Sequence, residues 1–550
     1  MILRPRLLSV AVFIVSITSS LLSQGVGVSV SNQLRYGSGR EAQGPFSAHR
    51  DYLENLTETR ITISDFLVGF RLLYDAPPEY GVEFTGIRKR YLEFRRDDLT
   101  IRAGNSFSLY GRGLALNLFE NRGLAFDTGL DGIKMEYTTR VFRLAATAGD
   151  IQYRDVLNLA RVENYRVRAG SVELTPYPFL SVGASIVSGI FSLPPPSFPD
   201  LRSQFDIPEY YVRFSVCGAL DGFVSYAEKR TTTYGDPSGT HRGTGCTGSL
   251  TYTSDQIGVS FEYKDYRFGI ADPYDRNLAN RAHKAYAFQN PPIVHKEHTF
   301  TLASRYPHII DFNDEVGFQT DVFYTVGQLT GSLNFSAASR HYSFSPTGDT
   351  NAIFQPIYGS MARTSSFWPT LDPKFSPFWE VYGEAQYFLE EGGNDYVLVA
   401  FNRRSMEIAE ELFVNPAGGP VIEATRLTGV PLSAQYTLSG DWVVKAVLER
   451  QWVYDATNSS DPSFTNQLIS LGVSQSPTYS VTIRYEFTSD KGTVDGRKDW
   501  TALDLGFRLG TKHNITLTIG GDRGGQICAN GVCRVVNPFL GVRAGLVSYL

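Results

Sequence analysis

The sequence predicts an all-β fold: a single large antiparallel transmembrane β-barrel behind a cleaved signal peptide. Strand-length segments alternate apolar and polar residues, aromatic residues bracket the apolar faces, and short connections alternate with long ones. Alternation alone fits any sheet with one buried face. Aromatic belts and short turns opposite long loops are typical of membrane barrels, so these two features favour a barrel over a soluble sandwich.

Residues 1–24 have the pattern of a secretory signal peptide. Arg4 and Arg6 precede an apolar run over residues 7–17, and small serines follow. The run is too short to cross a membrane as a helix. We therefore expect export to the outer membrane of a bacterial cell, with residues 25–550 as the mature barrel.

Composition supports one β-rich unit and excludes several classes of protein. Gly (51), Tyr (31) and Phe (36) are plentiful and Cys (4) is scarce, which excludes a disulfide-dense scaffold. A net charge of −5 over 550 residues supports neither nucleic-acid binding nor a polybasic membrane surface. No compositional break marks a linker, and we expect no cofactor.

The strand patterns define the barrel. In Tyr479–Phe487 the odd-numbered residues are apolar and face the polar even-numbered ones. Trp442 and Trp452 lie ten residues apart on one face, about 33 Å of strand, which projects to about 25 Å between aromatic belts at a tilt near 40°. Such segments number about two dozen, in a range of 18–26. Between Tyr306 and Pro377 the order of short and long connections fails, so one strand there is missed or invented.

The last hairpin is the most specific local pattern. Asn530-Gly531 is the dipeptide preferred in a type I′ turn, which places Cys528 opposite Cys533 at a non-hydrogen-bonded pair, close enough for a disulfide. We expect this tip to stiffen an exposed edge at the outer rim. Cys217 and Cys246 fall at opposite ends of the barrel and are expected not to bond to each other.

Apolar and polar residues alternate along the descending arm of this hairpin, residues 537–550, and the final residue is apolar. Bacterial outer-membrane barrels usually end this way, and the strand is the expected contact for the barrel-insertion machinery.

Residues 106–132 are the candidate for a segment that folds into the lumen. Charged and polar side chains crowd together there with several glycines, which permit close backbone packing. The functional interpretation is a constriction or plug that selects solutes. The alternative is a polar lumen wall or loop held by its own ion pairs. The candidate residues are Arg112, Glu120, Asn121, Arg122 and Asp127.

Residues 106–132, 291–299 and 523–534 together resemble an uncharacterised family of large bacterial outer-membrane barrel proteins. The cysteine hairpin is the most specific part of the resemblance. The family brings no known substrate or catalytic residues, so the resemblance implies fold and location only.

Histidine positions suggest neither a metal site nor an enzyme. His295 and His298 would point to opposite faces of a strand, which does not favour a metal site. The alternative is that they are histidines at the rim of the barrel, beside the long outer loop 267–295. A barrel hydrolase would need Ser or Asp paired with His, and the spacings around His341 and His513 are not diagnostic.

Two function classes remain. The first is a pore or transporter for small or medium solutes, with outer-membrane lipid as its surroundings. The second is a non-conducting barrel that acts as a surface receptor, adhesin or assembly component. A lumen filled by residues 106–132 would favour the second class or a gated transporter.

Overall fold

A computed structural model describes residues 25–550 apart from 44–45, 156–157, 194–200, 237–238, 277–280, 351–355, 364–366, 415–419 and 440. The expected signal peptide, residues 1–24, lies outside the described residues. Among the described residues, no helix is long and apolar enough to cross a membrane.

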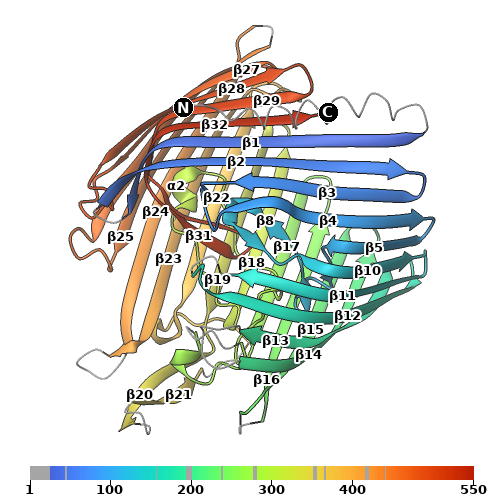
Figure 1. Ribbon diagram of the computed structural model, residues 1–550. Coiled ribbons are helices and arrows are strands. Elements are labelled where there is room, and N and C mark those ends of the chain that lie inside the picture. The colour runs from blue at the N-terminus through green and yellow to red at the C-terminus, as the bar shows by residue number, and fades with distance from the viewer. Residues whose placement is uncertain are drawn as a thin grey trace.

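The described chain forms a closed antiparallel barrel of 24 strands, each hydrogen-bonded to the next (Figure 1). Around the barrel the strands are β1 (Val26–Gln43), β2 (Phe46–Ile63), β3 (Phe66–Asp75), β4 (Phe84–Arg96), β5 (Leu99–Ser106), β10 (Leu130–Thr138), β11 (Phe142–Arg154), β12 (Val162–Tyr177), β13 (Leu180–Leu193), β14 (Leu201–Val216), β15 (Leu220–Thr233), β16 (Thr240–Thr253), β17 (Ile257–Arg267), β18 (Asp314–Val326), β19 (Leu329–Ser339), β22 (Phe378–Phe388), β23 (Tyr396–Val414), β24 (Pro420–Thr437), β25 (Trp442–Asp455), β26 (Ser463–Gln475), β27 (Tyr479–Thr488), β28 (Asp499–Leu509), β29 (His513–Asp522) and β32 (Phe539–Tyr549). The barrel closes where β32 pairs with β1, from Ser31 opposite Tyr549 to Glu41 opposite Phe539. Fold class and strand number are as the sequence predicts.

The two ends of the barrel differ in their connections. Tight turns join β2 to β3, β14 to β15, β18 to β19 and their counterparts at one end, the short-turn end. The connections 107–129, 268–313, 340–377 and 523–538 all lie at the other, the long-connection end. The four longest connections fall at one end because residues 268–313 supply no barrel strand. The irregularity expected between Tyr306 and Pro377 is therefore absent.

The outer surface is apolar, as the strand alternation predicts. On β27 the side chains of Tyr479, Val481, Ile483 and Tyr485 are 40–50% exposed, whereas Glu486 on the opposite face is 7% exposed. Trp442 and Trp452 on β25 are likewise exposed. An exposed apolar surface on most wall strands would be unstable in water, so it identifies a membrane-embedded barrel in contact with lipid.

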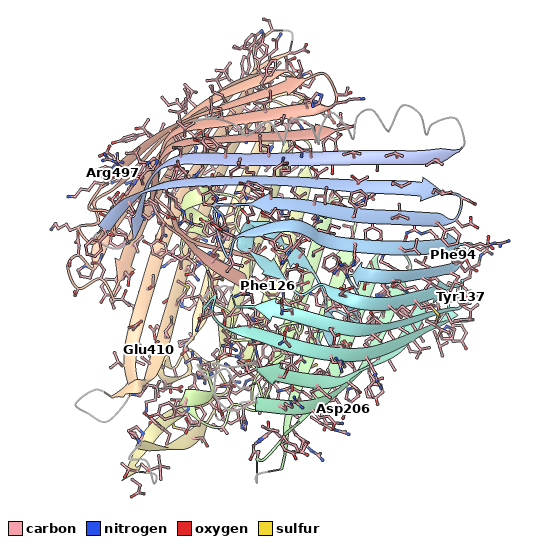
Figure 2. All side chains as sticks on the ribbon, in the orientation of Figure 1. Phe94, Phe126, Tyr137, Asp206, Glu410 and Arg497 are labelled. Atoms are coloured by element: carbon pink, nitrogen blue, oxygen red, sulfur yellow. A yellow bond between two sulfur atoms is a disulfide. The ribbon has the colours of Figure 1, made fainter. Side chains whose placement is uncertain are left out.

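Aromatic pairs mark the short-turn end. Phe66 contacts Phe94 with ring centroids 5.2 Å apart, and Tyr177 contacts Phe179 at 5.4 Å. Figure 2 shows Phe94 and Tyr137 together at this end, far from Glu410 and Arg497. Exposed aromatic rings at strand ends are the girdle expected at a membrane–water interface.

Three long connections fold into the barrel. The first inner segment, residues 107–129, carries the short pieces β6 (Leu109–Tyr110), β7 (Leu116–Asn117), β8 (Glu120–Asn121), η2 (Arg122–Leu124) and β9 (Phe126–Asp127). The second, residues 268–313, carries η3 (Pro273–Arg276) and α2 (Thr301–Ser304). The third is the inner hairpin, β30 (Gly525–Ala529) and β31 (Val532–Val536). Figure 1 shows β8 and β31 within the ring of strands, while the hairpin of β20 (Tyr342–Thr350) and β21 (Pro356–Ala362) projects beyond it.

The first two inner segments pack on the lumen face of β11–β17 in one apolar cluster. Leu114, Leu116, Tyr286 and Phe288 from the segments are at most 1% exposed and meet wall side chains such as Phe205. The rings of Phe205 and Tyr286 lie 4.4 Å apart. This half of the lumen is therefore a packed protein core and not a water-filled channel.

The cysteine hairpin has the predicted turn, but the hairpin does not lie where the sequence predicted it. Asn530 and Gly531 have φ of 51° and 73°, Cys528 pairs with Cys533 at a Cα separation of 4.1 Å, and the two form a disulfide. The hairpin does not extend β29 and β32, since it forms its own two-stranded sheet. Its tip touches the second inner segment, where Asn290 donates to the Asn530 carbonyl at 3.1 Å. Asn530 is exposed as expected, but the expected position of the tip at the outer rim is wrong, because the chain turns inward after Asp522.

Candidate functional site

Three of the five residues singled out from the sequence meet at one place in the lumen. Glu120 accepts ion pairs from Arg71 at 2.7 Å and from Lys89 at 3.1 Å, both on the barrel wall. Burial alone would raise the pKa of the Glu120 carboxyl, but Lys89 and Arg71 outweigh it and hold that pKa below its usual range.

Arg122 and Asp127 extend this charged contact with the wall. Arg122 binds Glu54 of β2 at 2.5 Å and the side-chain oxygen of Gln33 at 2.7 Å. Asp127 accepts from Lys89 of β4 at 3.0 Å. The first inner segment is therefore joined to β2–β4 through ion pairs and to β1 through a hydrogen bond, in contrast to its apolar contact with β11–β17.

The other two residues have different surroundings. Asn121 caps η2, accepting from the Leu124 backbone N–H at 3.2 Å. Arg112 lies toward the far wall, with its guanidinium 4.4 Å from the Phe223 ring centroid, and burial lowers its pKa. The five residues thus do not form a single constriction.

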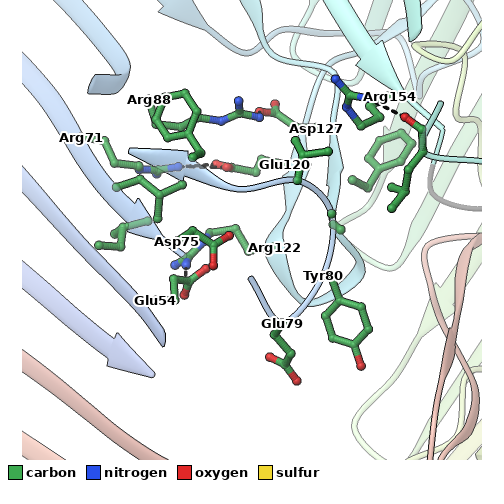
Figure 3. A pocket seen from close by; sticks show the side chains of 18 of the residues that line it. Glu54, Arg71, Asp75, Glu79, Tyr80, Arg88, Glu120, Arg122, Asp127 and Arg154 are labelled. Carbon is green, nitrogen blue, oxygen red and sulfur yellow. Dashed lines mark hydrogen bonds and ion pairs between the residues drawn. The ribbon is translucent and has the colours of Figure 1, made fainter. Parts of the chain in front are cut away.

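A pocket of about 370 Å³ opens beside Glu120, Arg122 and Asp127, and we call it the paired-charge pocket (Figure 3). Five arginines and five carboxylates line it, so its charges balance. The charged residues are Arg35, Arg71, Arg88, Arg122 and Arg154, with Glu54, Asp75, Glu79, Glu120 and Asp127. Asp75 and Arg154 lie at strand ends, which places the pocket in the half of the barrel nearer the long connections.

A second pocket, of about 420 Å³, lies against the inner hairpin, and we call it the arginine pocket. Strands β26–β29, β32, β1 and β2 form its wall, and α2 and the hairpin form its inner side. Arg35 and Glu79 line both pockets. The open part of the lumen therefore contains two charged pockets that adjoin at Arg35 and Glu79.

Buried polar contacts anchor the second inner segment to the wall. The Lys229 ammonium of β15 donates to the carbonyl oxygens of Arg281 at 2.6 Å, Ala282 at 2.7 Å and Lys284 at 2.6 Å. Lys229 is 1% exposed, so these three bonds satisfy a fully buried charge.

Arg276 of η3 forms a second anchor. It pairs with Asp311 at 2.5 Å, with Asp314 of β18 at 3.1 Å and with Glu411 of β23 at 3.1 Å. Burial opposes the charge, but the three carboxylates outweigh it and hold the pKa of Arg276 above its usual value.

Helix α2 forms a third anchor. The Glu449 carboxylate of β25 accepts from the backbone N–H groups of Thr301 at 3.0 Å and Leu302 at 2.7 Å. Nearby, His298 contacts Glu380 of β22 at 2.8 Å. The segment is therefore attached to wall strands on several sides of the lumen.

The interpretation of residues 267–295 as an outer loop with rim histidines is wrong. The His298 side chain is 2% exposed, and the His295 ring packs against His308 and Phe378 with centroids 5.5 and 5.9 Å away. Burial lowers the pKa of His295 well below its usual value. These histidines hold the inner segment in place.

The remaining cysteines and histidines have local roles. Cys217 and Cys246 are both free, as expected from their positions. His513 contacts the Ser548 hydroxyl at 2.9 Å across β29 and β32, where Ser548 is 7% exposed and helps to hold the two last strands together.

Sequence reasoning missed the second inner segment, although the wall carried a signal for it. In β13, Ile186 and Ile190 face outward while Val187, Phe191 and Leu193 face inward and are at most 1% exposed. A strand that is apolar on both faces is covered on both faces. Such runs in β12–β14 indicate that protein, and not water, lies against this part of the wall.

A model of a family of unknown function (DUF6029) matches residues 50–339. This match contains two of the three stretches on which the resemblance was based, residues 106–132 and 291–299, and ends before the cysteine hairpin. No curated protein matches the sequence.

Solved structures with a similar shape include membrane barrels of several kinds. The siderophore receptor PirA from Pseudomonas aeruginosa aligns with a TM-score of 0.43 and 6% identity, over 95% of this chain and 80% of that one. The P pilus usher PapC translocation pore gives 0.40 and 8%, over 95% and 99%. OccK5 (OpdH) from P. aeruginosa gives 0.33 and 12%, over 74% and 96%. No functional conclusion follows from scores this low.

Proposed function

The chain belongs to the DUF6029 family of unknown function, and we propose that it is a bacterial outer-membrane transporter for small or medium solutes whose lumen is closed at rest by its own inner segments. The observation that carries the proposal is the division of the lumen. An apolar core fixes the inner segments to β11–β17, while toward β1–β4 and β26–β32 the contacts are ion pairs beside the two charged pockets.

The two sides of the lumen differ in how easily they separate. Opening a path on the apolar side would expose buried aromatic side chains such as Phe205, Tyr286 and Phe288. For four such side chains the cost is roughly 15 to 25 kcal/mol at about 25 cal/mol per Å². The ion pairs on the charged side regain hydration when they separate, so each costs less: about 0 to 1 kcal/mol where exposed and roughly 3 to 5 kcal/mol for a buried pair that loses its partner. A solute path therefore opens most easily along the charged side, through the two pockets.

The orientation follows from the turns. Short turns face the periplasm and long connections face outward in bacterial barrels. Both pockets then lie in the outer half, where an arriving solute meets them first. The exposed apolar wall and its aromatic girdle fit insertion in the outer membrane.

The inner hairpin supplies the sharpest test, because Gln526, Arg534 and Val536 of the hairpin line the arginine pocket. Replacing residues 525–536 with a short Gly-Ser link should enlarge this pocket and raise the single-channel conductance in a planar bilayer well above that of the unmodified protein. The control variant replaces residues 456–462, the exposed connection between β25 and β26, with a short Gly-Ser link. This replacement should leave the conductance unchanged.

Folding of each variant is checked by its heat-dependent gel mobility and circular dichroism. A folded hairpin variant that conducts no better than the unmodified protein would contradict a transport path on the charged side. The strong anchoring of the second inner segment through Lys229, Arg276 and Glu449 supports the second candidate, a non-conducting surface receptor. That candidate expects no conductance from either protein.

A further inference from the structure

The arginine pocket carries more positive than negative charge. Six arginines line it, Arg35, Arg305, Arg484, Arg523, Arg534 and Arg543, against three carboxylates, Glu79, Glu486 and Asp522. Two further carboxylates pair with these arginines from outside the lining, Asp504 with Arg484 at 2.6 Å and Glu54 with Arg35 at 3.8 Å. One positive charge still remains in excess.

The carboxylates are shared between arginines. Glu486 pairs with Arg305 and, at 3.4 Å, with Arg523. Asp522 pairs with Arg543 and, at 3.3 Å, with Arg484. A guanidinium has five N–H donors, so each shared carboxylate fixes two arginines in position without using all their donors.

Several donors are buried without a partner. Among the described residues, Arg534 forms no ion pair, and its Nε is a buried nitrogen without a hydrogen-bond acceptor, as are the Nε atoms of Arg305 and Arg543. A buried donor that lacks an acceptor costs about 1 to 3 kcal/mol, and more when charged. Burial also lowers the pKa of both Arg305 and Arg534 from the usual value.

Aromatic rings hold three of these guanidinium groups in place. The Arg534 guanidinium lies 3.1 Å from the Tyr80 ring centroid, Arg543 lies 4.3 Å from Phe539 and Arg523 lies 5.4 Å from Trp500. Stacking keeps an arginine charged and oriented before any ligand arrives, which reduces the entropy lost on binding.

From this cavity, its excess of arginines and the stacking that orients them we infer that the arginine pocket binds a compact oxyanion with two or more negative charges. Planar guanidinium groups match carboxylate and phosphate oxygens in bidentate geometry. The volume of about 420 Å³ lies within the range of small-molecule sites, about 300 to 1,000 Å³. The inference rests on the proposed function only in treating this anion as the transported solute.

Isothermal titration of the purified full-length protein at physiological ionic strength tests it, with citrate and inorganic pyrophosphate as probes and acetate as the monovalent comparison. Citrate or pyrophosphate should bind with acetate much weaker, and the tighter of the two identifies a carboxylate or a phosphate ligand. Arg534→Gln and Arg523→Gln should each weaken binding about tenfold or more, because each removes charge-assisted hydrogen bonds.

Arg88→Gln is the matched control. Arg88 lines the paired-charge pocket and not the arginine pocket, so its loss should change binding less than twofold. Failure of both probes to bind, or an equal loss in Arg88→Gln, would overturn the inference. The binding measurement does not depend on conductance. If the anion binds but neither the unmodified protein nor the hairpin variant conducts, the result counts against transport alone. If the hairpin variant conducts but no anion binds, the result counts against the anion site alone.

Discussion

Lys229 allows the attachment of the second inner segment to be measured. Lys229→Met keeps most of the side-chain volume but removes the ammonium that bonds to the carbonyls of Arg281, Ala282 and Lys284. Three charge-assisted bonds of about 1.5 to 3 kcal/mol each are lost. The substitution also removes the free-energy cost of burying the ammonium, and this gain offsets several kcal/mol of the loss. We expect the free energy of opening this segment to fall by about 3 kcal/mol.

Hydrogen exchange followed by mass spectrometry gives the readout. A fall of about 3 kcal/mol speeds exchange roughly a hundredfold where exchange follows local opening. The increase should be confined to peptides that cover residues 281–290, while β23–β26 exchange as before.

Lys445→Met is the matched control, since Lys445 on the lumen face of β25 is exposed and forms no hydrogen bond among the described residues. Hydrogen exchange in the Lys445→Met variant should match that in the unmodified protein. If Lys229→Met changes residues 281–290 no more than Lys445→Met does, or if exchange rises equally in all strands, Lys229 is not a specific anchor.

Two further predictions concern the inner segments. Burial, with Arg281 and Arg161 nearby, lowers the pKa of Lys284 to about 7, so protonation favours the opened segment: its stability should fall as pH drops from about 10 to about 7 and then level off, and Lys284→Met should remove this dependence in exchange measured across that range. Gly531→Val places a Cβ 2.4 Å from Phe312 at a φ of 73° and should detach the hairpin tip, increasing exchange in residues 525–536. Gly510→Val has the same positive φ but open space around it, so it should show only backbone strain of about 1 kcal/mol, and equal exchange of the hairpin in the two variants would show that the tip contact contributes nothing.

Local patterns predicted the wall of the barrel. Alternation along β27 identifies its outward face, and Asn530-Gly531 determines the turn that brings Cys528 and Cys533 together. These features depend on residues a few positions apart, and period-two geometry or turn chemistry decides them.

The contents of the lumen could not be predicted in the same way. Alternation shows which face is inward but not whether water or protein covers it. The anchor between Lys229 and Ala282 joins residues 53 apart in sequence, and the pocket contact between Arg305 and Glu486 joins residues 181 apart. Glu120, Arg122 and Asp127 lie on one short segment, yet their wall partners come from three different strands, β2, β3 and β4. Only the closed barrel brings such groups together.

Arg35 and Glu79 line both pockets and pair with each other, while Arg35 also contacts Glu54. We expect the inferred anion in the arginine pocket to compete with Glu79 for the Arg35 guanidinium. Glu79 would then be released into the paired-charge pocket, whereas Glu54 stays paired with Arg122, so the affinity of that pocket for a cation should rise. By thermodynamic reciprocity, a cation bound there should strengthen anion binding by the same factor. The shared arginine would thus link the two pockets energetically, and the barrel would respond to pairs of oppositely charged ions and not to each ion independently.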